Sequence, residues 1–192
     1  MSNKNFNWGI IGPGRIANQF AKGLQVIDDA VMYAVASTSL ERAEAFANQY
    51  GGAKTYNSYE AMLNDPQVDG VYIATPHRYH FENIMQCLKA GKPVLCEKPL
   101  TVNANEARQL IKVSQDNKVF LMEALWSRYL PIYTVVRQWL DDKAVGDISL
   151  MVGTFGFNAP KDANDRWQNP ELAGGTLLDM GIYPIAISQW VM

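Results

Sequence analysis

Trp8-Gly9-Ile10-Ile11-Gly12-Pro13-Gly14-Arg15-Ile16-Ala17 is the stretch that decides the fold of this chain. It begins as an apolar strand and continues as a G-x-G-x-x-A pattern at the point where a helix should start. In such a loop the first glycine makes a tight turn, the second lets the backbone approach a pyrophosphate, and the third small residue lets helix and strand pack closely. Amides at the helix start would point at phosphate. The pattern predicts dinucleotide binding, with a structural glycine turn as the alternative. The residues expected to hold the cofactor here are Gly12, Gly14, Arg15, Ile16 and Ala17.

Strands and helices alternate over the first two thirds of the chain. Apolar runs predict strands at residues 6–11, 31–36, 71–74, 94–96 and 119–122. The segments between them predict helices at residues 15–25, 40–49, 59–63, 81–90 and 104–116. Continuous apolar strands joined by helical crossovers form parallel sheets that helices cover on both faces. The expected fold class is therefore α/β, with a Rossmann-like doubly wound parallel sheet.

The pattern changes after residue 141. Residues 147–157 predict a longer strand of a different character, residues 158–173 a polar loop and residues 175–192 a helix, while a helix at residues 130–140 would connect the two parts. We therefore expect a dinucleotide-binding domain at residues 1–125, a bridging helix region at 126–146 and the beginning of a second, α+β domain at 147–192.

Composition argues against several functional classes. The 192 residues are 48% hydrophobic and 19% charged, with a net charge of -2 and no basic block, so a nucleic-acid partner is not expected. No apolar run reaches membrane-spanning length, and the first residues lead directly into a strand without room for a signal peptide. Cys87 and Cys96 lack metal-type spacing and indicate reduced thiols. These features predict a soluble cytoplasmic protein without a membrane partner.

The end of the second predicted strand bears on the choice of cofactor. An NAD-binding site would place Asp or Glu there to accept hydrogen bonds from the ribose hydroxyls. This strand instead runs into Ser37 and Thr38, with Arg42 one helical turn further on. These three side chains could hold a 2′-phosphate, so NADP(H) is expected to be preferred and NAD(H) remains possible. A plain helix cap with a solvated arginine is the structural alternative.

Several motifs occur in an order that resembles one family. Beyond the glycine loop they are Ala74-Thr75-Pro76, Glu97-Lys98-Pro99 and residues 174–183 (GGTLLDMGIY). The chain resembles the glucose–fructose oxidoreductase/inositol dehydrogenase (GFO/IDH/MocA) family of NAD(P)-dependent oxidoreductases. Within it, residues 122–129 (MEALWSRY) and Pro170-Glu171-Leu172 are similar to the dihydrodiol and xylose dehydrogenase-like branch.

The resemblance implies a catalytic set. The matching lysine, Lys98, would lie beside the nicotinamide and polarise the reacting oxygen, in a turn with a cis Lys98–Pro99 bond. Asp179 would help to hold the substrate or the lysine. Tyr183 stands where many members carry histidine, and in the branch named above the tyrosine is taken as the acid/base. Further residues placed on the cofactor side are Thr75, Pro76, His80 and Glu97.

Physical chemistry agrees with these roles. Asp179 and Tyr183 are spaced i,i+4 and would share one face of a helix. An ammonium group near a phenol favours the phenolate, which suits Tyr183 for proton transfer. Lys98 would also stabilise an alkoxide as hydride leaves. The alternative for each residue is an ordinary role: a solvated lysine, a polar helix residue and a half-buried tyrosine.

Other candidates carry weaker signals. His77 and His80 form an H-x-x-H pair without an evident third ligand, so no metal is expected. Trp126, Arg128 and Arg166 could line a substrate site, because aromatic faces suit sugar rings or arenes. Packing at the edge of the core is an equal alternative for these three.

The function expected is hydride transfer between a nicotinamide and a CH–OH or C=O carbon of a sugar, polyol or dihydrodiol. A non-catalytic NADP(H)-binding redox sensor is the alternative, and a bare interaction module is disfavoured by the glycine loop. Family resemblance also implies a homodimer in the full-length form. It further implies an antiparallel sheet of which residues 147–157 would be only the first strand. We therefore expect an incomplete substrate domain and a 192-residue chain with weak turnover or none.

Overall fold

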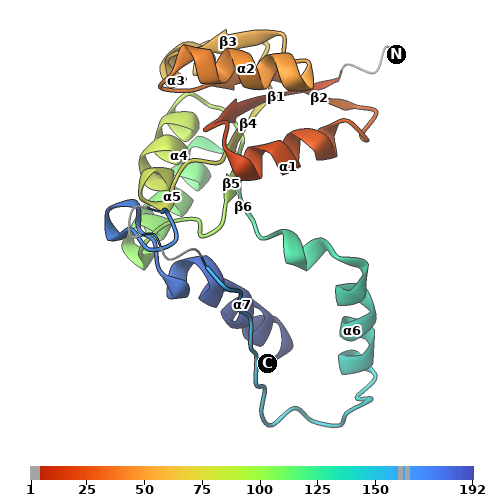
Figure 1. The fold of residues 1–192 in the computed structure, drawn as a ribbon. Coiled ribbons are helices and arrows are strands. Elements are labelled where there is room, and N and C mark those ends of the chain that lie inside the picture. The colour runs from red at the N-terminus through yellow and green to blue at the C-terminus, as the bar shows by residue number, and fades with distance from the viewer. Residues whose placement is uncertain (1–4, 160–161, 163–164) are drawn as a thin grey trace. The chain divides into compact units, whose positions relative to one another are not determined.

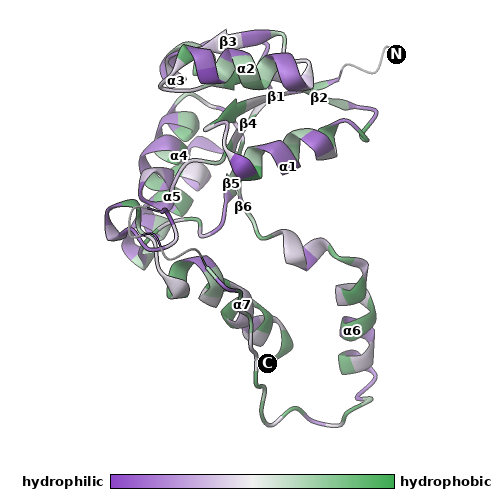
Figure 2. Cartoon of the chain, viewed as in Figure 1, coloured by the Kyte–Doolittle hydropathy of each residue, from purple (hydrophilic) through white to green (hydrophobic). Residues whose placement is uncertain are grey.

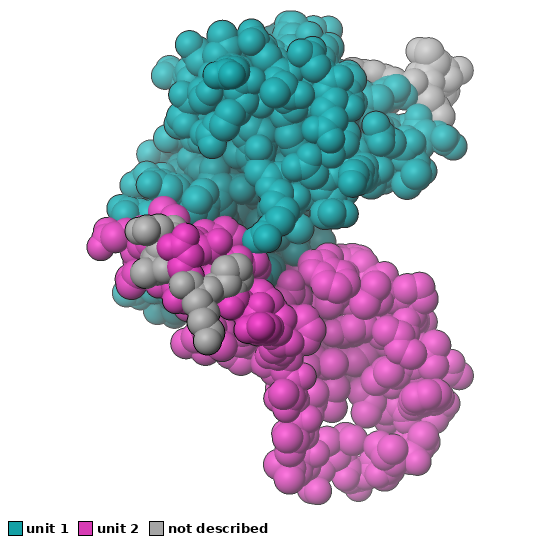
Figure 3. All heavy atoms as spheres, viewed as in Figure 1, with its two compact units in different colours: residues 1–124 teal, residues 125–192 magenta. Residues whose placement is uncertain are grey.

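The computed structural model of the chain describes residues 5–159, 162 and 165–192 (Figure 1). It divides into two compact units, Met1–Ala124 and Leu125–Met192 (Figure 3). Each unit is described by itself.

Unit 1 is a six-stranded, wholly parallel sheet with the strand order β3-β2-β1-β4-β5-β6. Its strands are β1 (Phe6–Ile11), β2 (Ala30–Ala36), β3 (Lys54–Tyr56), β4 (Gly70–Ile73), β5 (Val94–Glu97) and β6 (Leu121–Ala124). Its helices are α1 (Arg15–Leu24), α2 (Leu40–Tyr50), α3 (Tyr59–Leu63), α4 (His80–Lys89) and α5 (Ala104–Asn117), with a 3₁₀ turn η1 (His77–Tyr79) before α4. The order reverses between β1 and β4, which is the switch point where doubly wound sheets bind ligands. The predicted fold class is confirmed.

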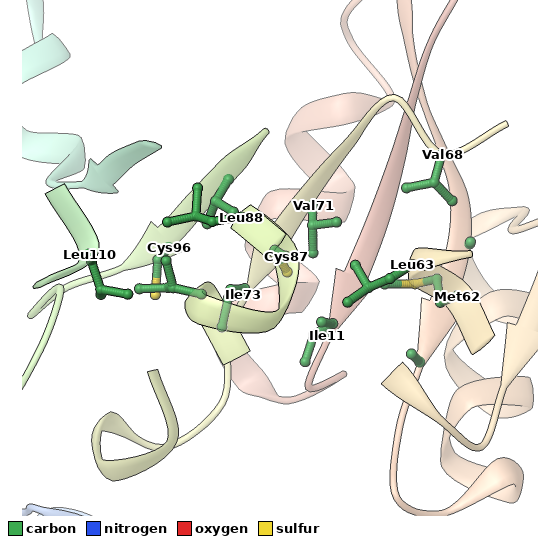
Figure 4. Packing of buried hydrophobic residues seen from close by; sticks show 14 residues of the cluster. Ile11, Met62, Leu63, Val68, Val71, Ile73, Cys87, Leu88, Cys96 and Leu110 are labelled. Carbon is green, nitrogen blue, oxygen red and sulfur yellow. The ribbon is translucent and has the colours of Figure 1, made fainter. Parts of the chain in front are cut away.

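Successive side chains along each strand point to opposite faces of the sheet, and each face is covered by a buried apolar layer. Ile11, Val71 and Ile73 pack with α3, α4 and α5 on one face, as Figure 4 shows for Cys87 and Leu88 of α4. Their neighbours along the strands face α1 and α2. That second layer contains Ile10, Val35, Tyr72, Ala17, Ala21 and Phe46 among others. Because both faces are covered, the strands read as continuous apolar runs rather than as alternating ones.

One strand of the sheet was not foreseen. β3 pairs with β2 through Ala34–Lys54, Val35–Thr55 and Ala36–Tyr56. It has only three residues at the edge of the sheet, and none of them is fully buried. A segment this short and polar lacks the apolar run that predicts a strand.

Unit 2 is mainly helical in its described residues. Its elements are the 3₁₀ turn η2 (Trp126–Tyr129), α6 (Pro131–Asp141), the 3₁₀ turn η3 (Pro170–Leu172), the π-helical turn η4 (Leu177–Gly181) and α7 (Ile182–Val191). Figure 2 shows that α7 is largely hydrophobic along its length. The helix expected at residues 175–192 begins with the π-helical turn η4 and continues as α7. π turns are often found at functional sites.

The strand predicted at residues 147–157 is wrong: the structure assigns no strand there. A strand is defined by hydrogen bonds to a neighbour, and no described segment pairs with these residues. The predicted loop at residues 158–173 includes positions outside the described residues. None of the helices in the described ranges is both long and apolar enough to cross a bilayer.

Candidate nucleotide and catalytic site

The turn between β1 and α1 is packed directly against the end of β4. Gly12 has a φ of +83°, and a Cβ built on it would lie 2.9 Å from both the backbone nitrogen and Cγ2 of Thr75. Glycine is therefore required here both by the backbone angle and by space. The glycine loop and the Ala74-Thr75-Pro76 motif, predicted separately from the sequence, thus meet at the switch point of the sheet.

Gly14 differs from Gly12, because nothing within the protein demands a glycine there. Its backbone is extended, and an added Cβ would meet only the Gly12 carbonyl oxygen, at 3.9 Å. Gly14 is also the N-cap of α1 and offers no side chain to the first-turn amides. A glycine with open space beside a helix start fits close approach of a pyrophosphate. Ala17 is fully buried and lets α1 lie close to the sheet.

The end of β2 carries the residues expected to choose between cofactors. Ser39 caps α2 by accepting a hydrogen bond from the Arg42 amide, and buried Ser37 accepts one from the Ser39 amide at 3.2 Å. The Arg42 Nη2 donates to Thr38 Oγ1 at 3.2 Å, and both side chains are exposed. The cap interpretation and the phosphate interpretation are therefore compatible: Ser37 and Ser39 shape the turn, while Thr38 and Arg42 present a hydroxyl and a guanidinium to solvent.

Lys98 lies in a turn directly after β5. The Lys98–Pro99 peptide bond is cis, as predicted from the family resemblance. The residue before the lysine, Glu97, is buried and accepts a hydrogen bond from the hydroxyl of Tyr72 in β4. Burial, followed by the charge of Glu97, holds the pKa of Tyr72 well above its usual range. The Tyr72 ring stacks on Phe20 of α1 with ring centroids 3.9 Å apart.

The peptide that follows Pro99 is held at both of its polar atoms. The Pro99 carbonyl oxygen lies 2.8 Å from Nδ1 of His80, and the Leu100 amide donates to Glu123 Oε1 at 2.7 Å. His80 is fully buried at the start of α4, and its Nε2 lies 2.8 Å from the Thr75 carbonyl oxygen. The sequence placed His80 near the nicotinamide end but did not single out Glu123. Nothing in the sequence around a glutamate in a strand predicts that its side chain contacts a turn 23 residues earlier.

Unit 2 brings together four of the predicted residues around its π turn. Tyr183 accepts a hydrogen bond from Trp126 Nε1 at 3.0 Å, and its ring lies 4.8 Å from that of Phe155. Asp179 is buried, and its Oδ1 lies 3.7 Å from Nη2 of Arg166. The spacing of four residues places Asp179 and Tyr183 near each other along the π turn and the start of α7. Trp126 and Arg166 thus lie beside the two predicted catalytic residues.

The remaining candidates are placed as follows. Arg128 lies over the ring of Trp190, 5.8 Å from its centroid. His77 packs edge-on against His80 at 5.7 Å. Among the described residues, no group of three His, Cys, Asp or Glu side chains could bind a metal ion. Lys98 belongs to unit 1, whereas Asp179 and Tyr183 belong to unit 2.

Comparison with protein families gives two matches that together cover most of the chain. Residues 6–125 match the family described as an oxidoreductase family with an NAD-binding Rossmann fold. Residues 133–192 match the GFO/IDH/MocA C-terminal domain.

Individual relatives are similar over nearly the whole chain. D-xylose 1-dehydrogenase (NADP(+)) of Hypocrea jecorina is 40% identical over 204 residues, which cover 96% of this chain and 51% of that protein. Trans-1,2-dihydrobenzene-1,2-diol dehydrogenase of Mus musculus is 43% identical over 178 residues, with 92% and 53% covered. The chain spans about half the length of these relatives.

A solved structure is similar to this chain in both fold and sequence. KijD10, a 3-ketoreductase from Actinomadura kijaniata in complex with NADP and TDP-benzene, superposes with a TM-score of 0.86 and 31% identity. The match covers 98% of this chain and 57% of that one.

Proposed function

The chain belongs to the GFO/IDH/MocA oxidoreductase family, and on that premise we propose that it acts as an NADP(H)-dependent dehydrogenase on a sugar, polyol or dihydrodiol. The family resemblance stated from the motifs is thereby confirmed. The redox-sensor alternative finds no support, because the relatives are named as dehydrogenases and a ketoreductase.

One observation carries the nucleotide-binding part of the proposal. Gly12 is locked against Thr75 at the switch point, while Gly14 has open space at the uncapped start of α1. The pyrophosphate would lie at this helix start, held by the amides of Arg15, Ile16 and Ala17. Thr38 and Arg42 would hold the 2′-phosphate, in keeping with the NADP named for the xylose dehydrogenase and bound in the ketoreductase.

The bound nicotinamide would accept or supply the hydride. Lys98 would stabilise negative charge on the reacting oxygen. An ammonium group placed where an alkoxide develops stabilises the transition state and so lowers the barrier. Tyr183 would take the hydroxyl proton of the alcohol on its phenolic oxygen during oxidation and return it during reduction. Asp179 would position the substrate or the lysine, and Trp126 and Arg166 would line the substrate side.

The setting of the enzyme is part of the same proposal. We place it in the cytoplasm, where thiols stay reduced; Cys87 and Cys96 are both free and buried. Burial raises the pKa of the Cys87 thiol to about 12, which keeps it unreactive. The full-length form would be a homodimer with a small-molecule substrate and neither a nucleic-acid nor a membrane partner.

Titration with NADPH and a steady-state assay test the function. Nicotinamide fluorescence should report NADPH binding by the 192-residue chain, and NADP⁺ reduction should be measured with D-xylose and with trans-1,2-dihydrobenzene-1,2-diol. In an active form that spans the length of the relatives, Lys98→Met and Tyr183→Phe should each leave NADPH binding largely intact and lower turnover by about 10²–10⁴-fold. Near-normal turnover in either variant would overturn the assigned roles, and absence of NADPH binding would overturn the function.

A further inference from the structure

The turn that carries Lys98 is fixed by side chains from two other elements. Its Pro99–Leu100 peptide has one acceptor and one donor, and both are engaged: the carbonyl oxygen by His80 of α4 and the amide by Glu123 of β6. Holding both ends of one peptide fixes its plane. The Cα of Lys98 is one residue before that plane, so the same two contacts help to fix where its Cα–Cβ bond points.

We propose that His80 and Glu123 are positioning residues that aim Lys98 by clamping the Pro99–Leu100 peptide. This inference rests on the proposed function, because it concerns the lysine expected to meet the reacting oxygen. Neither side chain needs to touch substrate or cofactor to act in this way. A displacement of about 1 Å in a catalytic group can cost about a hundredfold in rate, so a clamp on the turn has a direct route to turnover.

His80 ties the clamp to the nucleotide side of the site. Its two ring nitrogens lie 2.8 Å from carbonyl oxygens in two different turns, Pro99 after β5 and Thr75 after β4. Thr75 is the residue on which Gly12 packs. A carbonyl oxygen only accepts hydrogen bonds, so each ring nitrogen donates to its carbonyl only while it carries a proton, and a neutral imidazole donates to one of the two at a time. One buried imidazole thus spaces the lysine turn from the glycine loop.

Substitutions at His80 and Glu123 can retain or remove the individual contacts of the clamp. The amide nitrogen of asparagine lies about as far from Cα as Nδ1 of histidine, and that of glutamine reaches about as far as Nε2. His80→Asn can therefore still donate to Pro99, whereas His80→Gln can donate only toward Thr75. At the other end, Glu123→Gln keeps an acceptor oxygen for the Leu100 amide, and Glu123→Ala removes it.

Asn83 supplies a matched control. It is buried one turn after His80 on α4 and donates from Nδ2 to Thr75 Oγ1 at 3.0 Å. Asn83→Ala removes a side-chain contact between the same helix and the same turn, yet leaves Pro99 and Leu100 untouched. A merely structural role for His80 would make this control behave like His80→Gln.

Two readouts test the clamp: turnover in an active form that spans the length of the relatives, and the environment of Lys98 in the 192-residue chain. In the assay with NADP⁺ and D-xylose or the dihydrodiol, His80→Gln and Glu123→Ala should lower kcat about ten- to a hundredfold, and Glu123→Ala should leave the Kd for NADPH within about twofold of wild type. His80→Asn and Glu123→Gln should recover most of that loss, and Asn83→Ala should show little of it. Thermal unfolding followed by circular dichroism identifies any variant that does not fold.

The second readout needs no activity and separates failure of the clamp from failure of the function. Lysines dimethylated with ¹³C-formaldehyde give one methyl signal each, and Lys98 is assigned by its absence in Lys98→Arg. In His80→Gln and Glu123→Ala this signal should narrow and move toward that of exposed lysines, while it stays in place in the other three variants. An unchanged Lys98 signal, or equal changes in all five variants, would overturn the clamp even if the chain proves an active dehydrogenase.

Discussion

At the scale of single residues, the contact between Arg42 and Thr38 has the clearest consequence for cofactor choice. Both side chains are exposed at the carboxyl end of β2, and no carboxylate stands at the position that would accept hydrogen bonds from ribose hydroxyls. A guanidinium with a neighbouring hydroxyl is a good partner for a dianionic phosphate. This pair is therefore where discrimination between the two nicotinamide cofactors should be measured.

Thr38→Asp should reverse the preference. The new carboxylate would repel a 2′-phosphate and accept hydrogen bonds from ribose hydroxyls, so we expect NADPH affinity to fall about tenfold or more while NADH affinity holds or rises. Isothermal titration with both cofactors measures the change. Thr38→Ser, which keeps the hydroxyl, is the control. Equal or tighter binding of NADH by the unmodified chain would refute this assignment.

A second residue-scale feature is the buried carboxylate of Asp65. It accepts hydrogen bonds from the Tyr56 hydroxyl at 2.7 Å, the Lys54 ammonium at 2.9 Å and the Gln67 amide at 2.9 Å. Burial alone would raise the pKa of Asp65, but these contacts outweigh it and hold the pKa well below its usual range. Burial and the hydrogen bond to Asp65 raise the pKa of Tyr56 to about 12.

Asp65 should make unit 1 sensitive to acid. Since its pKa is lower in the folded than in the unfolded chain, its stabilising contribution is present above about pH 4 and is lost as the pH falls through the folded value. Asp65→Asn should cost about 1–3 kcal/mol at pH 7. In urea unfolding followed by circular dichroism, the gap to wild type should shrink from about pH 5 downward. A gap that does not vary with pH would contradict the assignment.

At the scale of elements, the two glycines of the β1–α1 turn differ in what the fold requires of them. Gly12 is confined by its positive φ and by Thr75, whereas Gly14 has an ordinary extended backbone and open space beside it. The packing of the protein requires glycine at position 12 but not at position 14, where we expect the requirement to come from the bound pyrophosphate.

Alanine at each glycine should show this separation. Gly12→Ala should destabilise unit 1 by about 1–3 kcal/mol, because strained backbone and overlap with Thr75 add together. Gly14→Ala should leave the thermal midpoint within a few degrees of wild type and weaken NADPH binding about tenfold or more. Thermal unfolding and NADPH fluorescence on both variants provide the test. Loss of stability in Gly14→Ala, or intact binding in it, would count against the pyrophosphate role.

The elements of unit 1 could be predicted because their signals are local. Apolar runs gave five of the six strands, and the helices between them were placed within a few residues. β3 was missed because it is held by pairing with β2 and not by its own composition. Residues 147–157 failed for the opposite reason: they have the composition of a strand, but no described neighbour pairs with them. Strand formation depends on a partner that composition cannot supply.

At the scale of the whole molecule, apolar side chains in this segment remain uncovered. Leu150 is 78% exposed, Val152 83% and Phe155 51%. Contiguous exposed apolar residues favour association. Single exposed apolar residues elsewhere, such as Val26 at 83%, do not form such a patch.

The 192-residue chain should therefore self-associate. Static light scattering should give a mass above that of one chain, increasing with concentration. Leu150→Lys with Val152→Glu should shift the mass toward the monomer without altering the circular dichroism of the folded chain. Val26→Glu, at a position as exposed as Val152 but outside the segment, should change nothing. A monodisperse monomer in the unmodified chain would contradict this expectation.

Site residues fall into two classes with respect to prediction. Gly12 and Gly14 lie in a motif whose spacing suggests phosphate binding, and Lys98 lies in a motif shared with the family, so the sequence alone is enough to propose these three residues. Glu123 acts on the turn at Leu100 only because β6 lies beside β5. This contact depends on the order of strands in the sheet, so the spacing of residues along the chain does not predict it.

Sheet order also gives the molecule a modular character that a protein engineer could use. β2, whose carboxyl end leads toward Thr38 and Arg42, is separated from β5, which leads into Lys98, by β1 and β4. Three strand spacings amount to about 14 Å, which exceeds the distance over which exposed charges interact at physiological ionic strength. We therefore expect that substitutions after β2 can exchange one nicotinamide cofactor for the other without disturbing the turn that carries Lys98, so that each end of the site can be engineered separately.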